Sequence, residues 1–297
     1  MSLDGLLLLD KPAGPTSFEV VRRVRRAVKV KKAGHLGTLD PFATGLLPLA
    51  LGAATRLAPF LEGLDKTYLA EMELGRETDT QDLTGRVVAE HPVAVSEAEI
   101  RAQAARFVGE IEQVPPLYSA LRHQGRRLYE LARRGIAVEV RPRKVTIHRL
   151  EVQEIRLPRV ILLVTCSKGT YIRTLAHDLG RALGCGAHLA ALRRLAVGPF
   201  RVEEALPLAE VTRNPELARE RLIPLADCLP FMPALSVAPA EAARLAQGQS
   251  LVRPLTEARP GERVRLLADG RLLAVAEWRR DPRGLLLAPV RVFRLPR

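Results

Sequence analysis

Residues 34–56 read GHLGTLDPFATGLLPLALGAATR, and this stretch constrains the fold more than any other. Glycine and proline interrupt its apolar residues, so its first half is a poor helix and a poor strand. We therefore expect an ordered loop that is buried against the core. Asp40 stands in this loop between Leu39 and Pro41, where the proline favours an extended Asp40 and an unpaired carboxylate is energetically costly. Asp40 thus needs a cation or a cage of hydrogen bonds, and either a structural turn or a catalytic carboxylate fits these residues.

The segment before this loop predicts a strand and a helix. Residues 5–9, GLLLL, are typical of a short buried strand, which residues 11–15, KPAGP, end with a turn. Thr16 and Glu19 have the spacing of a capping box at the start of an amphipathic helix. The predicted apolar face holds Phe18, Val21, Val24 and Val28, and the predicted cationic face holds Arg22, Arg26 and Lys29.

The segment after the loop alternates between strand and helix patterns without a regular βα repeat. Residues 66–74 alternate between apolar and polar side chains, which indicates a half-buried strand. Ser96 has the features of a helix cap, and residues 160–166 form an apolar strand that runs into the turn 167–170. A helix over residues 172–183, which Gly184 ends, follows. This clustering favours an α+β fold over a doubly wound parallel sheet.

The chain changes character near residue 230. Prolines punctuate short segments there, and residues 262–267, 271–278 and 285–292 each have a strand pattern. The pair Asp269-Gly270 is a strong hairpin signal between the first two of them. We therefore expect two domains, a large one over residues 1–230 and a small β-rich one over residues 231–297.

Charge indicates a polyanionic partner. The chain of 297 residues has 46 Lys and Arg against 33 Asp and Glu, a net charge of +13. The excess is local: residues 20–32 hold seven basic residues and no acidic one, and residues 117–149 hold nine against two. Clusters of this kind are typical of a surface that faces nucleic acid phosphates. A generally basic proteome, or the arginine usage of a thermophile, is the alternative explanation.

Other patterns limit the class of protein. The cysteines Cys166, Cys185 and Cys228 have no paired spacing, which fits a reducing compartment and no disulfide framework. No apolar run approaches the roughly 18 residues that span a bilayer, and no signal sequence is evident. We therefore expect a cytoplasmic protein that does not bind or cross a membrane. The spacing of histidines and cysteines predicts no metal site. Nucleotide-binding glycine motifs are missing too, so we expect no cofactor.

Residues 34–41, GHLGTLDP, resemble the signature Gly-His-x-Gly-x-Leu-Asp-Pro of the TruB-type pseudouridine synthases. Further segments resemble the family in the same order: GLLLLDKPAGPTSF, ATGLLPLALGAATRL, DKTYLAEMELGRETDTQDLTG, PPLYSALRHQGRRLYELARRGI, CSKGTYIRTLAHDLG and CGAHLAALRRLAVGPF. They cover most of residues 5–200. The last 65 or so residues resemble the RNA-binding PUA domain of the family more weakly. The resemblance implies a catalytic domain with a mixed, largely antiparallel sheet, followed by a small PUA-like domain.

The resemblance also implies a set of site residues. Asp40 matches the catalytic aspartate of the family, Tyr68 its active-site tyrosine, and Arg173 the arginine that pairs with the aspartate. On the substrate-binding side, the matched residues are Tyr171, Leu192, which lines the uracil pocket, His35, which contacts the rearranged T-loop, and Lys11 of the opening motif. A basic insertion over about residues 117–142, the thumb, matches a segment that presses on the T-loop, and Arg122, Arg126 and Arg127 would contact phosphates there.

The implied reaction converts one uridine in the T-loop of tRNA, at tRNA position 55, to pseudouridine. A uridine in a folded RNA loop must be flipped out before its C1′–N1 bond can be reached. A carboxylate can then act by attack on the uracil ring, by attack on the sugar C1′, or through elimination to a glycal. The implied partner is tRNA, through its T-arm and through its acceptor end at the C-terminal domain. We expect a monomer without an obligatory protein partner.

Two other functions fit the residues. The first is a non-catalytic protein that binds and remodels tRNA, and an intact set of Asp40, Tyr68 and Arg173 argues against it. The second is an rRNA-modifying synthase of an RNA-guided complex, which would depend on a guide RNA and on partner proteins.

Overall fold

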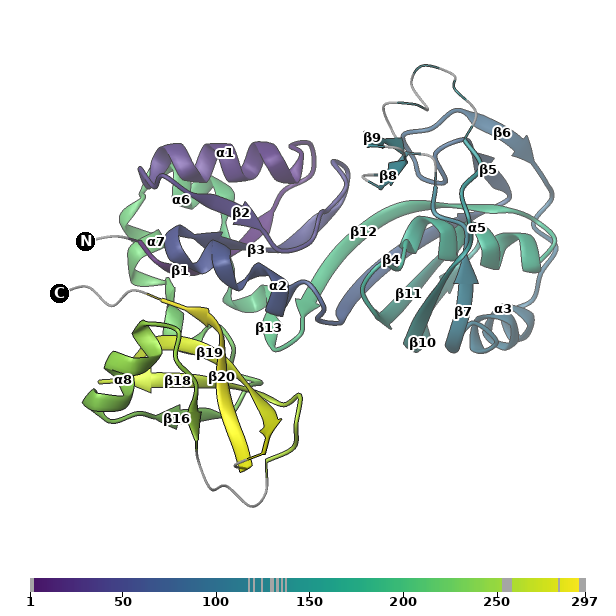
Figure 1. Cartoon of the computed structure of the whole chain (residues 1–297). Coiled ribbons are helices and arrows are strands. Elements are labelled where there is room, and N and C mark those ends of the chain that lie inside the picture. The colour runs from purple at the N-terminus through teal and green to yellow at the C-terminus, as the bar shows by residue number, and fades with distance from the viewer. Residues whose placement is uncertain are drawn as a thin grey trace.

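The computed structural model describes residues 3–293 except 117, 120, 124, 129–130, 132–133, 135, 137, 253–257 and 283, and it leaves the side chains of residues 122, 123, 126 and 127 undescribed. Two sheets organise the described residues, a long one that runs across the molecule and a small one near the C-terminus (Figure 1). The fold is α+β, as the sequence predicts.

The long sheet has eleven strands in the described part of the chain and is mixed but mostly antiparallel. Its strands follow the order β14-β1-β3-β12-β4-β11-β10-β7, and β2, β13 and β15 pair beside this path. The parallel pairs are β1 with β14 and β3 with β12. The bounds in chain order are β1 Gly5–Lys11, β2 Ala33–His35, β3 Thr44–Leu51, β4 Lys66–Leu74, β7 Gly109–Gln113, β10 Arg143–Arg156, β11 Arg159–Cys166, β12 Ala187–Val197, β13 Phe200–Arg201, β14 Leu206–Pro207 and β15 Ile223–Pro224.

Helices cover both faces of this sheet. One hydrophobic core lies beneath α1 and α5, and a second lies on the opposite face beneath η1 and α2. Strand β1 is buried on both faces, because Leu7 and Leu9 belong to the first core and Leu6 and Leu8 to the second, which explains its unbroken apolar run. The bounds are α1 Ser17–Ala27, η1 Gly52–Leu57, α2 Ala58–Leu61, α3 Glu97–Ala105, α5 Ile172–Ala182, η2 Val202–Glu204, α6 Leu208–Arg213, α7 Glu216–Glu220 and η3 Leu225–Asp227.

The small sheet has the order β16-β18-β19-β20-β17 and packs with α8. Its elements are β16 Ala234–Ser236, α8 Pro239–Ala246, β17 Leu251–Val252, β18 Arg263–Ala268, β19 Arg271–Asp281 and β20 Gly284–Val292. Two short hairpins lie outside both sheets. One pairs β5 Arg76–Thr78 with β6 Val87–Glu90, and the other pairs β8 Arg122–His123 with β9 Arg126–Arg127. The β8–β9 hairpin belongs to the thumb.

The small sheet is joined to the catalytic part by an apolar interface. Leu272, Val275 and Phe293 pack in the same hydrophobic cluster as Phe60 of α2. The guanidinium of Arg56 lies 5.0 Å from the centre of the Phe293 ring. We propose the boundary between two domains near residue 230, since β16 begins four residues later, although the two parts share a core.

Most predicted elements are confirmed, and three features differ. The segments predicted as strands near residues 5–9, 66–74 and 160–166, the helices after Ser96 and before Gly184, and the Asp269-Gly270 hairpin are all present. Strands β3, β10 and β12 were not predicted; in β3, glycine and proline obscure the pattern. At α1, Thr16 caps the Glu19 amide, but the Glu19 carboxylate pairs with Arg23 instead of completing a capping box. Phe18, predicted on the apolar face, is 73% exposed.

Gly45 provides a test of how β3 is fitted into the sheet. Its φ is +97°, and a Cβ at this position would lie 2.3 Å from the backbone oxygen of Arg194 in β12. We expect Gly45→Ala to lower the free energy of unfolding by about 2–4 kcal/mol, because strain and a backbone clash add together. Gly63→Ala, where a Cβ would meet nothing within 4 Å, is the control and should be nearly neutral. Equal denaturation midpoints for the two variants would contradict this packing.

Candidate active site

The loop that carries Asp40 connects β2 to β3 and is held by hydrogen bonds from α1 and from the turn before it. Ser17, the first residue of α1, accepts a hydrogen bond from the Leu39 amide at 2.8 Å and donates one to the Leu39 oxygen at 2.9 Å. The Pro41 oxygen accepts from the Gly14 amide at 2.8 Å. The loop therefore has a defined conformation on either side of Asp40.

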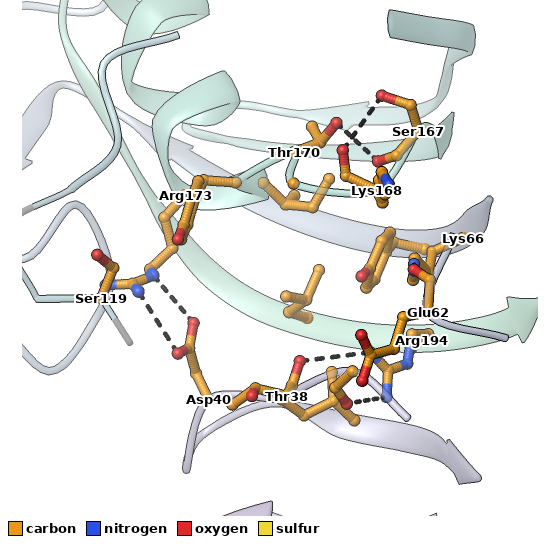
Figure 2. Close-up of a pocket in the computed structure, with 17 residues that line it drawn as sticks. Thr38, Asp40, Glu62, Lys66, Ser119, Ser167, Lys168, Thr170, Arg173 and Arg194 are labelled. Carbon is orange, nitrogen blue, oxygen red and sulfur yellow. Dashed lines mark hydrogen bonds and ion pairs between the residues drawn. The ribbon is translucent and has the colours of Figure 1, made fainter. Parts of the chain in front are cut away.

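Two nitrogen atoms of Arg173 contact the Asp40 carboxylate. Its Nε lies 2.9 Å from Oδ2, and its Nη2 lies 3.4 Å from Oδ1 (Figure 2). The side chain of Arg173 is 5% exposed and that of Asp40 is 34% exposed, so the pair lies at the border between core and pocket. The sequence predicted this partnership, and the structure brings the two residues together from positions 133 apart in the chain.

A second carboxylate, that of Asp82, lies on the other side of Arg173. Its Oδ2 accepts a hydrogen bond from Arg173 Nη1 at 3.2 Å, and both side chains are 5% exposed. Asp82 is itself held by Thr84, whose amide and hydroxyl donate to Oδ1 at 2.9 and 2.5 Å. The carbonyl oxygens of Thr80 and Tyr118 accept the remaining Arg173 bonds at 3.1 and 3.0 Å. Sequence reasoning assigned no role to Asp82, although it lies within the family-like run DTQDLTG.

Burial raises the pKa of the Asp40 carboxyl above its ordinary value. The positive charges of Arg173 and Lys11 oppose the rise, and the negative charge of Asp82 adds to it. Asp40 is thus a more basic carboxylate than a solvated aspartate, and it is held in a fixed direction by its partner.

Lys11 has a different place from the one predicted. It was expected to bind substrate, but it is 0% exposed, and its Nζ donates to the oxygens of Pro12, Pro41 and Ala43 at 2.9, 3.1 and 2.7 Å. An ammonium group has three donors, and all of them are used here. Burial lowers the pKa of Lys11 to about 8, although Asp40 opposes this shift. Lys11 therefore lies under the loop and holds it, instead of facing the pocket.

Arg194 of β12 holds the other side of the loop, and sequence reasoning did not single it out. It is 1% exposed, its Nε donates to the Leu46 oxygen at 2.7 Å, and its Nη atoms donate to the oxygens of Thr38 and Gly37 at 3.3 and 3.1 Å. Figure 2 shows the hydrogen bond from Arg194 to the Thr38 oxygen.

A pocket of about 280 Å³ opens next to Asp40, close to the lower limit of about 300 Å³ for small-molecule sites. Tyr68, Tyr171 and Leu192 line it, as the resemblance implied, with Tyr68 and Leu192 on the adjacent strands β4 and β12. Burial raises the pKa of the Tyr68 phenol, so the hydroxyl keeps its proton at neutral pH. Two further cations, Lys66 and Lys168, line the pocket and were not predicted.

The remaining predicted residues lie outside this pocket or outside the described side chains. His35 ends β2, is half-buried, and is not among the residues that line the pocket. The side chains of Arg122, Arg126 and Arg127 are not described, so their predicted phosphate contacts stay a prediction. Among the described residues, no group of His, Cys, Asp and Glu side chains could hold a metal ion. Over the same residues, no helix is both long and apolar enough to cross a membrane.

The comparisons with known proteins place this fold and pocket in a class of RNA-modifying enzymes. Residues 25–172 match the model of the TruB family pseudouridylate synthase N-terminal domain, and residues 173–229 match that of the tRNA pseudouridylate synthase B C-terminal domain. The chain belongs to the TruB family of pseudouridine synthases.

Similar proteins extend the match to nearly the whole chain. The tRNA pseudouridine synthase B of Azoarcus sp. (strain BH72) is 49% identical over 93% of this chain and 91% of its own. That of Burkholderia pseudomallei (strain 668) is 50% identical over 98% and 97%. Among solved structures, a Cbf5-Nop10-Gar1 complex gives a TM-score of 0.77 at 30% identity over 98% of this chain and 85% of that one. An H/ACA RNP bound to a substrate RNA gives 0.76 at 28% identity over 99% and 86%.

The double partnership of Arg173 predicts a pH effect of Asp82→Asn. If Asp40 acts as the carboxylate, kcat/KM falls as the pH drops through the pKa of Asp40, and Asp82 raises that pKa. Loss of the Asp82 charge should therefore move the acid limb of the kcat/KM profile to lower pH. The plateau should fall about tenfold or more, because Arg173 loses a buried partner.

Asp79→Asn is the matched control, since Asp79 lies in the same segment and pairs with the exposed Arg86. It should leave both the limb and the plateau unchanged. An acid limb that stays in place, or moves upward, in Asp82→Asn would contradict the assignment of charge coupling between Asp82 and Asp40.

Proposed function

We propose that this chain isomerises the T-loop uridine of tRNA to pseudouridine and that Asp40 is the essential residue. The observation that carries the proposal is the Asp40–Arg173 pair at the mouth of a pocket of about 280 Å³ in a chain of this family. A pocket of this volume suits a single nucleobase. A base that stays in its RNA stack cannot reach such a pocket, so the reaction requires nucleotide flipping.

The pocket suits a base that must be held while it turns. Tyr68 offers an aromatic face and Leu192 an apolar wall, and both are 8% exposed. Such surfaces hold a uracil ring by stacking and packing without fixing one hydrogen-bonded orientation. We therefore propose that Tyr68 stacks on the uracil ring while the ring turns.

The reaction needs no external atom. The C1′–N1 bond breaks, the uracil turns, a C1′–C5 bond forms, C5 loses its proton and N1 gains one. Asp40 can attack covalently or stabilise charge at the sugar, and an ionised carboxylate is required in either role. Arg173 favours that ionised form, because its charge lies 2.9 Å from Oδ2 through Nε and its Nη2 donates a hydrogen bond to Oδ1 at 3.4 Å.

We propose that the thumb and the C-terminal domain determine which part of the tRNA the chain binds. We propose that the T-arm is bound by the thumb, whose arginines Arg122, Arg126 and Arg127 would contact phosphates, and that the small sheet adds contacts toward the acceptor end. We also propose that Tyr171 and His35 contact the flipped nucleotide and the reshaped loop. The chain would act as a monomer in the cytoplasm. A tRNA-binding protein without catalysis is the alternative.

Asp40→Asn separates catalysis from binding. The substitution should lower the single-turnover rate by at least about a thousandfold, because the amide can neither attack nor carry the negative charge. The Kd for unmodified tRNA should change less than about twofold, since phosphate contacts supply most of the affinity. Rapid-quench measurement of pseudouridine, and filter binding on the same RNA, give the two quantities.

Asp65→Asn is the control, because Asp65 is half-exposed and pairs with His148 away from Arg173. Residual activity of more than a few per cent in Asp40→Asn, with deamidation excluded by mass spectrometry, would contradict the essential role of Asp40. An inactive wild-type protein that binds tRNA would favour the non-catalytic alternative.

A further inference from the structure

Helix α1 carries a cationic stripe with an aromatic residue at its start. Positions 18, 22 and 25 lie within about 60° of one another on a helix of 100° per residue, so Phe18, Arg22 and Arg25 form one line. All three are exposed, whereas Val20 and Val24 are buried on the far side of the helix and Val21 is buried at the edge of the stripe. We call Phe18, Arg22 and Arg25 the α1 stripe.

Phe18 has no structural reason to be exposed. Helix α1 is already anchored by its buried valines and by Ser17, so burial of Phe18 contributes nothing to the core. A large aromatic side chain in water forgoes the stabilisation that burial would give, roughly 1.5–3 kcal/mol. An exposed aromatic next to basic side chains is typical of surfaces on which nucleobases stack.

The cations of the stripe form no close ion pair among the described residues. Glu19 pairs with Arg23, which lies on the flank of the helix, and no described carboxylate pairs with Arg22 or Arg25. Exposed Arg26, Lys29, Lys31 and Lys32 extend the positive charge beyond the stripe. Such a surface is complementary to a polyanion.

The position of the stripe is fixed relative to the catalytic loop. Ser17 is hydrogen-bonded to Leu39 through both its donor and its acceptor, and Phe18 is the next residue along the chain. Figure 1 shows α1 over β1, β2 and β3, on the side of the sheet opposite the small C-terminal sheet. The start of the stripe is therefore next to the loop that carries Asp40, on a face that the C-terminal domain does not share.

We propose that the α1 stripe is a second RNA-binding surface, on which Arg22 and Arg25 bind phosphates that flank the target uridine and Phe18 stacks on an unpaired base. This inference rests on the proposed function, because the RNA is the substrate of the Asp40 site. The contact adds affinity and positions the RNA so that the target uridine lies at the Asp40 pocket. It takes no part in the exchange of the glycosidic bond. It is thus distinct from both the thumb and the C-terminal domain.

The test uses the full chain and a hairpin RNA that contains only the T-arm. The double variant Arg22→Ala/Arg25→Ala should raise the Kd about tenfold near 0.1 M salt and reduce the log–log salt slope by about 1.5–2, at roughly 0.7–0.9 per lost phosphate contact. The single-turnover rate at saturating RNA should stay within about twofold. Arg106→Ala/Arg181→Ala, which removes two exposed arginines of the α3–α5 side, should change neither quantity.

Phe18 is tested separately. Phe18→Ala should raise the Kd at least about fivefold, whereas Phe18→Tyr should retain the wild-type value, because stacking needs an aromatic face. Phe18→Trp adds a fluorophore whose emission the hairpin should quench; the single native tryptophan, Trp278, is 2% exposed in the small sheet and supplies a constant background.

An unchanged Kd and salt slope in the double arginine variant, or no quenching in Phe18→Trp, would overturn the proposal. A wild-type chain that forms no pseudouridine in the same hairpin would instead overturn the proposed function. The two failures are therefore distinguishable in one set of samples. Thermal melting of each variant should match the wild type, because all the substituted side chains are exposed.

Discussion

The site depends on one buried guanidinium held between two carboxylates. Arg173 is 5% exposed, and such a charge would be costly in the core without partners. Asp82 and the oxygens of Thr80 and Tyr118 satisfy it from the protein side, which leaves Nε and Nη2 directed at Asp40. The Asp40 carboxylate thus receives its orientation from a side chain that is itself held by several partners. The first turn of α5 and the Asp82 segment both hold that arginine.

The loop that carries Asp40 is held by cations in the same way. Lys11 and Arg194 together donate to the oxygens of five loop or strand residues and of Pro12, and neither is exposed by more than 1%. Glycine and proline deny the loop a regular backbone ladder, so its carbonyl groups need donors from side chains. These basic residues are therefore part of the scaffold, while the charges available to RNA lie on the surface, at α1 among other places.

Much of this could be predicted from the sequence, and the failures have physical causes. That Asp40, Arg173, Tyr68 and Leu192 lie at one pocket was predictable because their motifs match a family. The strands at residues 66–74 and 160–166 were predictable because their periodicity is regular. Asp82 and Arg194 were missed because their roles come from contacts between residues more than 90 positions apart, which no local pattern reveals. The place of Lys11 was missed because its ammonium group bonds backbone oxygens of a loop about 30 positions away. Phe18 was assigned to the core by hydrophobicity, which does not distinguish a buried aromatic from one exposed for binding.

The central claim is that this chain alone converts one T-loop uridine through the Asp40 site. The most direct measurement is to incubate the purified full-length chain with an unmodified tRNA transcript and to map pseudouridine at each nucleotide by carbodiimide-stop sequencing. The account predicts a single new stop at the T-loop uridine, without guide RNA or added protein. No stop, a stop elsewhere, or a stop that requires a guide RNA or a partner protein would contradict it.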